Sequence, residues 1–228
     1  MNVSSFSKKN KINALLVHQE NATAASIQFW FRAGSALEGK KDEGIAHFLE
    51  HMFFKGTKKR PGSQIANEVE SFGGELNAFT SFDFTCYYIN CPQNQIYNST
   101  DIILDMVSNP SFDQEDITPE IGVVHEEFKR SFDSPSQFAF TELQESFFTG
   151  KYRHQILGTE KTILNFSKRQ LIEFRKKYYN QENSLIIISG NLKNKNKITD
   201  LVEKYKLPSG QKSLFEKFKL SPKNRFSF

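Results

Sequence analysis

The chain has 228 residues, of which 38% are hydrophobic, and this is enough to bury the core of one sizeable domain. Its 30 basic and 26 acidic residues leave a net charge of only +4, and the basic residues form no long stripe, so we expect no nucleic-acid partner. No apolar run approaches the roughly 20 residues of a membrane helix, and we expect no membrane segment.

Two cysteines, Cys86 and Cys91, lie in the stretch TCYYINC. If this stretch is one strand, their spacing of five residues places them on opposite faces and roughly 16 Å apart. A disulfide needs Cα atoms within about 7 Å, so we expect two free thiols in a reducing compartment. The N-terminal segment has no acidic residue before Glu20, which weakly resembles a transit peptide, but it has no cleavage signal. We therefore expect a cytoplasmic protein.

The first half of the chain predicts a mixture of strands and helices. Ile27, Phe29 and Phe31 alternate with more polar residues, which is typical of a strand with one packed face. Ser63 is expected to cap a helix that Gly73 ends. In chain order we expect strands at 12–18 and 24–34, helices at 44–54 and 63–73, and a hairpin of strands at 75–81 and 84–91.

The second half predicts mostly helices. The order of elements is not a regular alternation of strand and helix, so the best class is α+β, with a mostly antiparallel sheet packed by several helices. Residues 1–206 form one expected lobe, and residues 207–228 form a linker-like tail whose end, NRFSF, reads as the start of a strand. Helices are expected at 94–108, from a start near 116–120 to residue 132, and after Pro135. A loop at 151–160 follows, and then a helix at 167–179, a strand at 183–191 and a last helix at 194–206.

The stretch GIAHFLEHMFFKGT, residues 44–57, carries two of the five histidines of the chain. His47 and His51 are four residues apart, so on a helix they lie on one face and can bind one metal ion. Glu50 lies beside that face, within reach of a water on the metal. Zinc suits two nitrogens and one carboxylate with an open fourth position. The alternative is an ordinary amphipathic helix that happens to contain two histidines.

A third ligand is expected from the later segment PEIGVVHEEFKR. Glu120 and Glu127 are seven residues apart there and share one helix face. If this helix packs against the histidine helix, Glu127 could bind the metal while Glu120 supports the site from behind. Taken alone, each glutamate would be an ordinary solvated carboxylate.

The order His-x-x-Glu-His is the reversed zinc signature of the inverzincins. With it, the chain resembles the family of pitrilysin, insulin-degrading enzyme and mitochondrial processing peptidase. The resemblance covers about residues 10–206. Residues 32–88 are similar to the N-terminal lobe of that family, and GVVHEEFKR resembles its third-ligand segment, with Glu127 placed 76 residues after His51. ILGTE and SLIIISGN also resemble landmarks of the family.

The resemblance implies a role for each candidate residue. His47, His51 and Glu127 would bind one zinc ion. Glu50 would be the general base, and Glu120 the auxiliary acidic residue. Asn77, in ELNAFTS, would lie on the strand that borders the cleft and help to hold the substrate backbone, which can pair with a strand edge. The alternative for Asn77 is an ordinary strand-end asparagine.

The implied function is that of a zinc-dependent endopeptidase that hydrolyses peptides or unfolded polypeptides. Members of the family combine two lobes, so the chain would be one half of an enzyme that needs a second lobe or subunit, in a homodimer or a heterodimer. The alternative is a zinc-stabilised, non-catalytic interaction module derived from the same lobe. Glu50 favours the enzyme, because structural zinc sites usually fill all four positions with protein ligands. The donor set also leaves manganese or cobalt open.

Overall fold

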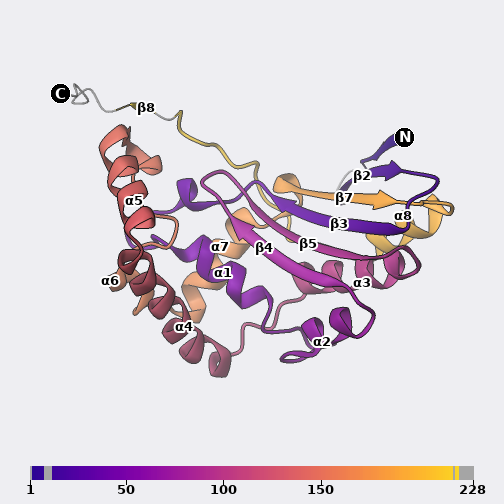
Figure 1. The fold of residues 1–228 in the computed structure, drawn as a ribbon, viewed down its shortest axis with the longest axis horizontal. Coiled ribbons are helices and arrows are strands. Elements are labelled where there is room, and N and C mark those ends of the chain that lie inside the picture. The colour runs from indigo at the N-terminus through magenta and orange to yellow at the C-terminus, as the bar shows by residue number, and fades with distance from the viewer. Residues whose placement is uncertain (1, 8–11, 218, 221–228) are drawn as a thin grey trace.

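The structure is a computed structural model, which describes residues 2–7, 12–217 and 219–220 (Figure 1). The expected strand start NRFSF lies outside these residues. The strands are β1 (Asn2–Phe6), β2 (Asn13–His18), β3 (Ala24–Phe31), β4 (Glu75–Thr80), β5 (Thr85–Pro92), β6 (Phe148–Thr149), β7 (Ser184–Gly190) and β8 (Lys219–Leu220). The helices are α1 (Ile45–Phe53), α2 (Gln64–Ser71), α3 (Ile96–Ser108), α4 (Gln114–Asp133), α5 (Pro135–Phe147), α6 (Glu160–Ile163), α7 (Lys168–Tyr178) and α8 (Lys195–Lys204).

Six strands form one sheet in the order β1-β2-β7-β3-β5-β4. Every neighbouring pair is antiparallel except β2 and β7, which run parallel. The predicted α+β class with a mostly antiparallel sheet is therefore confirmed. Strand β4 lies at one edge, and it pairs only with β5 among the described strands. This edge matters below, because α1 packs beside it.

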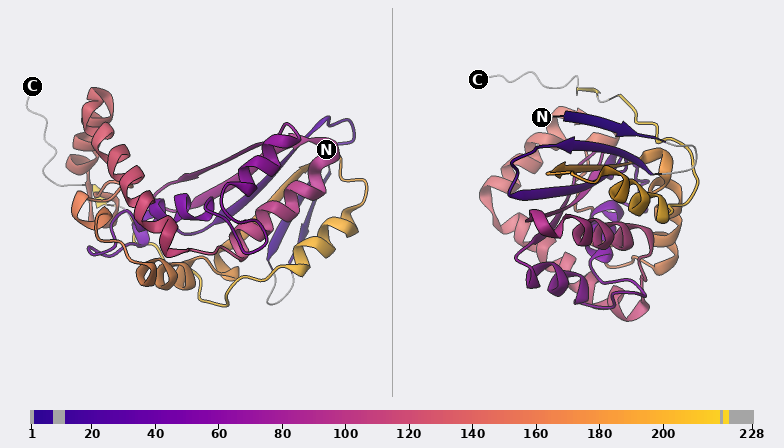
Figure 2. Two further views of the ribbon diagram at one scale, coloured as in Figure 1. Left: turned by 90° about the horizontal axis from the view of Figure 1, so that it is seen from below. Right: turned by 90° about the vertical axis from the view of Figure 1, so that its right-hand side faces the viewer.

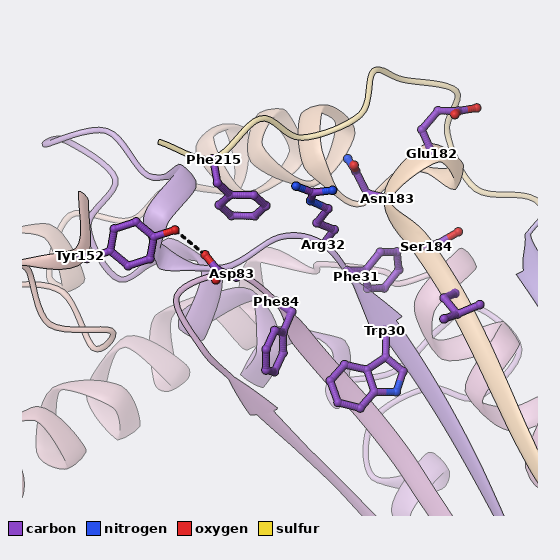
Figure 3. A pocket seen from close by; sticks show the side chains of 11 residues that line it. Trp30, Phe31, Arg32, Asp83, Phe84, Tyr152, Glu182, Asn183, Ser184 and Phe215 are labelled. Carbon is purple, nitrogen blue, oxygen red and sulfur yellow. Dashed lines mark hydrogen bonds between the residues drawn. The ribbon is translucent and has the colours of Figure 1, made fainter. Parts of the chain in front are cut away.

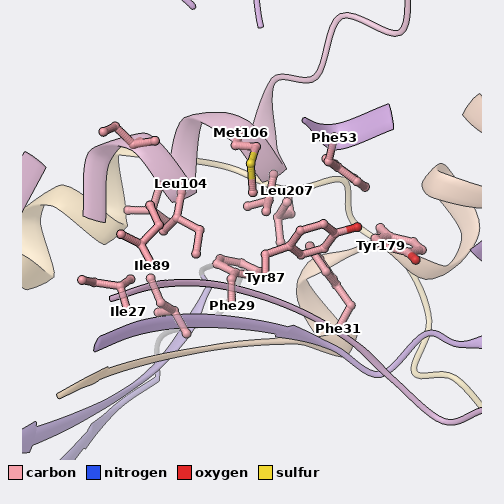
Figure 4. Packing of buried hydrophobic residues seen from close by; sticks show 14 of the residues in the cluster. Ile27, Phe29, Phe31, Phe53, Tyr87, Ile89, Leu104, Met106, Tyr179 and Leu207 are labelled. Atoms are coloured by element: carbon pink, nitrogen blue, oxygen red, sulfur yellow. The ribbon is translucent and has the colours of Figure 1, made fainter. Parts of the chain in front are cut away.

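Helices cover one face of the sheet, as Figures 1 and 2 show. Helix α3 packs on β3 and β5, and α8 packs on α3. The alternation expected for β3 is observed, since Ile27, Phe29 and Phe31 are fully buried on the helical side. Aromatic rings then fix α1 to the sheet (Figure 4). The ring of Phe53 lies 5.1 Å from that of Tyr87 and 5.6 Å from that of Tyr179.

The other face of the sheet, which we call the open face, carries a cluster of half-exposed aromatic rings. The ring of Trp30 lies 5.7 Å from that of Phe79 and 5.2 Å from that of Phe84. The ring of Phe79 also contacts Tyr88, at 6.4 Å. Phe79 remains 42% exposed, so this cluster is a packed but uncovered apolar surface.

Several local expectations can be compared directly with the structure. Cys86 and Cys91 both lie in β5 and are free and buried, as expected. Gly73 has a φ of +74°, which agrees with its expected role in ending α2. Ser63 precedes α2, but its side chain makes no capping hydrogen bond, so that prediction was wrong in its detail. Its hydroxyl instead accepts a hydrogen bond from the side-chain amide of Asn67.

The segment expected to be a linker is attached to the lobe over its first residues. Leu207 is buried in the core, and the backbone carbonyl of Gln211 accepts hydrogen bonds from the side chains of Asn180 and Asn183. The backbone N–H of Ser213 donates to the side chain of Asn183. The described tail therefore runs along the lobe rather than away from it. Among the described residues, no helix is both long and apolar enough to cross a membrane.

Candidate metal centre

The start of helix α1 is formed by Gly44 and stabilised by the buried carboxylate of Glu38. Gly44 has a φ of +92°, which a residue with a side chain rarely adopts. The carboxylate of Glu38 accepts hydrogen bonds from the backbone N–H groups of Gly44 and Ala46, at 2.8 and 2.9 Å. These contacts satisfy donors that the first turn of a helix leaves free. Burial nevertheless raises the pKa of Glu38, although His154 and these N–H groups oppose the shift.

The apolar residues of α1 face the core, and this orients its polar side. Phe48, Met52 and Phe53 are completely buried. His47 and His51 therefore project toward α4, and the helix packs on both α4 and the edge strand β4. Their rings lie 4.7 Å apart, as the four-residue spacing predicts.

The structure brings His47 and His51 together with Glu127. One ligand atom from each of the three lies within 4.8 Å of the others. Nε2 of His47 is 3.7 Å from Oε1 of Glu127, and Nε2 of His51 is 3.5 Å from Oε2. Atoms that bind one tetrahedral ion at about 2.0–2.2 Å lie roughly 3.3–3.6 Å from each other. The donor set therefore fits a zinc ion. The two distances between histidine and glutamate are close to this range, and the limit of 4.8 Å for the whole set means that the ligands would move closer together on binding.

Glu120 lies behind this cluster, as expected, and is not one of its three members. Its Oε1 is 2.7 Å from Nδ1 of His51, while its Oε2 pairs with the ammonium of Lys55. Burial works against the charge on Glu120, but the contacts with His51 and Lys55 outweigh it and lower its pKa. An ionised Glu120 can accept a hydrogen bond from the protonated Nδ1 of His51, which leaves Nε2 as the nitrogen that would bind a metal.

The pKa values of the two histidines are shifted in opposite directions. Burial first, and then the nearby His51, lowers the pKa of His47 to about 4. Burial also acts against a charge on His51, but its hydrogen bonds with Glu120 and Glu127 outweigh this and raise its pKa to about 9. At neutral pH and without a metal, His47 is thus neutral and His51 carries a proton on both ring nitrogens, and a metal bound at Nε2 of His51 would displace one of them. Nδ1 of His47 is buried without a hydrogen-bond partner among the described residues.

Glu50 lies beside the cluster and contacts the edge strand instead. Its Oε2 accepts a hydrogen bond from the hydroxyl of Thr80, at 2.5 Å. Burial raises the pKa of Glu50, and the bond from Thr80 partly offsets that rise. A carboxylate with a raised pKa beside a candidate metal site is suited to accept and return a proton.

Asn77 lies on the exposed edge strand and does not contact the cluster. Its Oδ1 accepts a hydrogen bond from the backbone N–H of Ala78, and it pairs across the sheet with Tyr88. Its side chain therefore lies on the open face, as does that of Phe79 two residues later, on the strand against which α1 packs. Its role in substrate binding stays a prediction.

The sequence reasoning did not identify Thr80 and Lys55, which contact Glu50 and Glu120. Lys55 follows His51 by four residues, the same spacing that revealed the histidine pair, so this signal was present. Thr80 is three residues beyond Asn77 on the same strand, but no periodicity distinguishes it from its neighbours. Its contact depends on how β4 meets α1, which local sequence does not encode.

A separate pocket of about 510 Å³ lies at one end of the open face (Figure 3). The guanidinium of Arg32 stacks over the ring of Phe215, and the hydroxyl of Tyr152 donates to Asp83. None of its lining residues belongs to the cluster of histidines and glutamate. The candidate metal site therefore lies outside this pocket, between α1 and α4 and close to β4.

An α+β lobe with a His-x-x-Glu-His helix and a glutamate from a second helix defines a metallopeptidase-type domain. The model of the insulinase family, peptidase family M16, matches residues 13–160. The chain belongs to this family. The predicted relationship to insulin-degrading enzyme and its relatives is thereby confirmed.

Similar proteins extend the comparison beyond the matched segment. An uncharacterized zinc protease of Rickettsia bellii is 35% identical over 213 residues, which are 91% of this chain and 51% of that protein. The crystal structure of a protease from Helicobacter pylori has a TM-score of 0.84 at 25% identity and covers 95% of this chain and 53% of its own. An inactive M16 peptidase domain from Pseudomonas fluorescens also has a TM-score of 0.84, at 20% identity, over 95% of this chain and 53% of its own. The chain thus spans about half the length of these proteins.

Proposed function

We propose that this chain is a zinc-dependent endopeptidase lobe that hydrolyses peptides or unfolded polypeptides. The observation that carries the proposal is the convergence of His47, His51 and Glu127 beside Glu50, a carboxylate that is not itself part of the cluster. This leaves room for a water and a substrate carbonyl, which a closed structural site would not provide.

Each residue of the site has a definite task in this proposal. One zinc ion, when held by His47, His51 and Glu127, would polarise the scissile carbonyl and lower the pKa of a water. Glu50 accepts the proton of that water and returns it to the leaving amine. Thr80 holds one carboxylate oxygen of Glu50 and leaves the other for the proton. Glu120 keeps the Nδ1 proton of His51 in place.

The substrate is proposed to bind as an extended chain along β4. Among the described strands, β4 lies at the edge of the sheet and pairs on one side only, so a peptide can pair with its outer side. Asn77 lies on this strand, three residues before Thr80. A peptide paired with β4 therefore passes the carboxylate of Glu50, which Thr80 contacts.

A second lobe or subunit is proposed to complete the enzyme. The chain spans 51% of its Rickettsia bellii relative, and the aromatic cluster on its open face is uncovered. The two free, buried cysteines support the proposal of a reducing, cytoplasmic location.

The second candidate function is a zinc-stabilised interaction module without activity. The similarity in fold to an inactive M16 domain favours it. The geometry of Glu50 argues for the enzyme, because a module that only binds zinc needs no carboxylate held ready beside the metal.

The deciding experiment is cleavage of an unfolded polypeptide by the purified chain, with and without a chelator. We expect cleavage that the chelator abolishes and that zinc restores. The Glu50→Gln variant should bind zinc as tightly as the wild type but lose hydrolysis, since the amide cannot accept the proton. A wild-type chain that binds zinc and cuts nothing, even with a partner lobe supplied, would favour the non-catalytic module.

A further inference from the structure

One buried carboxylate is shared by two side chains of the same segment. Glu120, on α4, contacts Nδ1 of His51 with one oxygen and the ammonium of Lys55 with the other. His51 lies in the last turn of α1, and Lys55 follows that helix by two residues. The three side chains form a clamp between the end of α1 and the first half of α4, which we call the His51–Glu120–Lys55 clamp.

Glu120 is more deeply buried than Lys55, so its charge depends on this ion pair more than the charge of Lys55 does. The side chain of Glu120 is 4% exposed, whereas that of Lys55 is 33% exposed. Lys55 can therefore be hydrated without its partner. Glu120 is too buried to be hydrated in the same way. If it loses its cation, its carboxylate either turns toward water or keeps a buried negative charge with no nearby positive charge to balance it.

The orientation of Glu120 has two consequences for the cluster. Its contact with Nδ1 fixes the ring of His51 so that Nε2 points toward Glu127. It also fixes α4 against α1, and Glu127 follows Glu120 by seven residues, which is two helical turns on the same face. A shift of Glu120 would thus displace two members of the cluster together.

We propose that Lys55 is a positioning residue of the metal centre, which holds Glu120 in the orientation that aligns His51 and Glu127 for zinc. This inference rests on the zinc site of the proposed function but not on hydrolysis. Lys55 touches neither the cluster nor a reacting atom.

A positive charge near a metal ion also repels it, so the removal of Lys55 has two opposing effects on zinc affinity. Lys55 is one-third exposed, and water and salt screen its repulsion. Its contact with Glu120 involves a carboxylate whose side chain is only 4% exposed, and screening is weaker there. The loss of orientation is therefore expected to exceed the relief of repulsion.

The test measures the affinity of the purified chain for zinc alone, by competition with a fluorescent chelator. Lys55→Met should weaken zinc binding about 10–100-fold, the usual effect of removing an outer-shell contact. Lys55→Arg keeps the charge and should restore most of the affinity. Lys59→Met is the matched control, because Lys59 forms a similar pair with Asp101, away from the cluster, and its loss should leave zinc binding unchanged.

A spectroscopic readout separates positioning from a general loss of stability. The Nδ1 proton of His51 should give a protected, downfield NMR signal in the zinc-loaded wild type and in Lys55→Arg. The signal should be lost or shifted in Lys55→Met but not in Lys59→Met. If Lys55→Met does not fold, Lys55→Gln replaces it. In the wild type itself, the Lys55 ammonium should give slowly exchanging protons, and their absence would also contradict the proposal.

The outcomes distinguish this inference from the proposed function. A wild-type chain that binds no zinc would overturn both. If the wild type binds zinc and folded Lys55→Met binds it equally well or more tightly, only the role of Lys55 is overturned.

Discussion

At the scale of single residues, Glu127 differs from the other two candidate ligands because its side chain is 43% exposed. An exposed carboxylate is common without a metal, so its role needs its own test. Glu127→Gln should reduce zinc affinity by more than the roughly 10–100-fold expected for an outer-shell residue, because it removes a direct ligand. Elemental analysis after dialysis measures this loss.

The neighbouring Glu126 provides the matched control for Glu127. It has the same charge but pairs with Lys129 in solvent. Glu126→Gln should keep full zinc occupancy. Equal occupancy in both variants would remove Glu127 from the ligand set.

Thr80 gives a second prediction at this scale. Its hydroxyl holds Glu50, and hydrogen bonds to charged groups contribute about 1.5–3 kcal/mol. Thr80→Val has nearly the same shape, so it should lower kcat about 10–100-fold while KM and zinc affinity stay the same. Steady-state kinetics measure this, and Thr80→Ser should recover activity. Unchanged kcat in Thr80→Val would show that Glu50 needs no such support.

These residues also show how far sequence reasoning reaches. His47, Glu50 and His51 are local, so helical spacing alone predicts their arrangement, and the structure agrees. Glu127 is 76 residues beyond His51, and no local pattern joins them. The shared helix face made it a candidate only if two helices pack together, and the resemblance to a family then assigned it the role of third ligand. Thr80 and Lys55 act through contacts between elements, which only the fold reveals.

At the scale of elements, the start of α1 depends on Gly44. A Cβ at this position would lie 2.3 Å from the backbone carbonyl oxygen of Leu157, and φ is +92°. Gly44→Ala should therefore cost more than the roughly 1–3 kcal/mol of backbone strain alone, because the loop at Leu157 must also move. Gly73→Ala is the matched control, since φ is +74° there but a Cβ would meet nothing within 4 Å.

Urea unfolding of both glycine variants gives the comparison. A larger loss of unfolding free energy in Gly44→Ala than in Gly73→Ala is expected. Equal losses of unfolding free energy would show that the loop at Leu157 moves away from the new Cβ at no extra cost in free energy. The zinc affinity of Gly44→Ala should also fall, because His47 lies in the first turn of the helix.

A second element-scale prediction concerns the ion pairs around α3. Asp101 accepts hydrogen bonds from Lys59 and Arg60, which follow α1, and from Tyr205, which follows α8. Burial opposes its charge, but these three donors outweigh it and hold its pKa well below the usual range. As the pH falls, Asp101 therefore binds a proton in the unfolded chain, at a pKa of about 3.9, before it does so in the folded chain.

The sign of the pH dependence follows from that order. Asp101 stabilises the fold at pH values above about 4, and this contribution is lost as the pH falls toward its lower pKa in the folded chain. Urea unfolding at several pH values should show Asp101→Asn less stable than the wild type at pH 6, with the difference shrinking below pH 4. A difference independent of pH would contradict this. Glu173→Gln, which breaks an exposed pair with Arg169, should change little at any pH.

Sequence patterns predicted most strands of the lobe and all its helices except the short α6, because each of these elements carries its own periodicity. They did not give β1, whose sequence NVSSF is short and largely polar and becomes a strand by pairing with β2. Nor did they predict the parallel pairing of β2 with β7, since paired residues such as Asn13 and Leu185 are far apart along the chain. Long-range pairing and strand order are decided by packing and not by local preference.

At the scale of the whole molecule, helices cover one face of the sheet (Figure 2). The other face carries the aromatic cluster, in which Phe79 is 42% exposed. Apolar surfaces of this kind are typical of association sites. The chain also spans 53% of the Helicobacter pylori protease it resembles. The proposed second lobe would therefore lie over the open face and enclose the peptide bound along β4.

This arrangement predicts that the isolated chain associates through its open face. Sedimentation at micromolar concentrations should show dimers, and Phe79→Lys should shift them to monomers, because it places a charge in the aromatic cluster. Leu164→Lys is the matched control, since Leu164 is 47% exposed against 42% for Phe79 but lies outside this cluster. Phe79→Lys should still bind zinc, because the ligands lie on α1 and α4. A wild-type chain that is monomeric at every concentration would mean that the open face needs a different chain to cover it, and that two copies of this one do not form the enzyme.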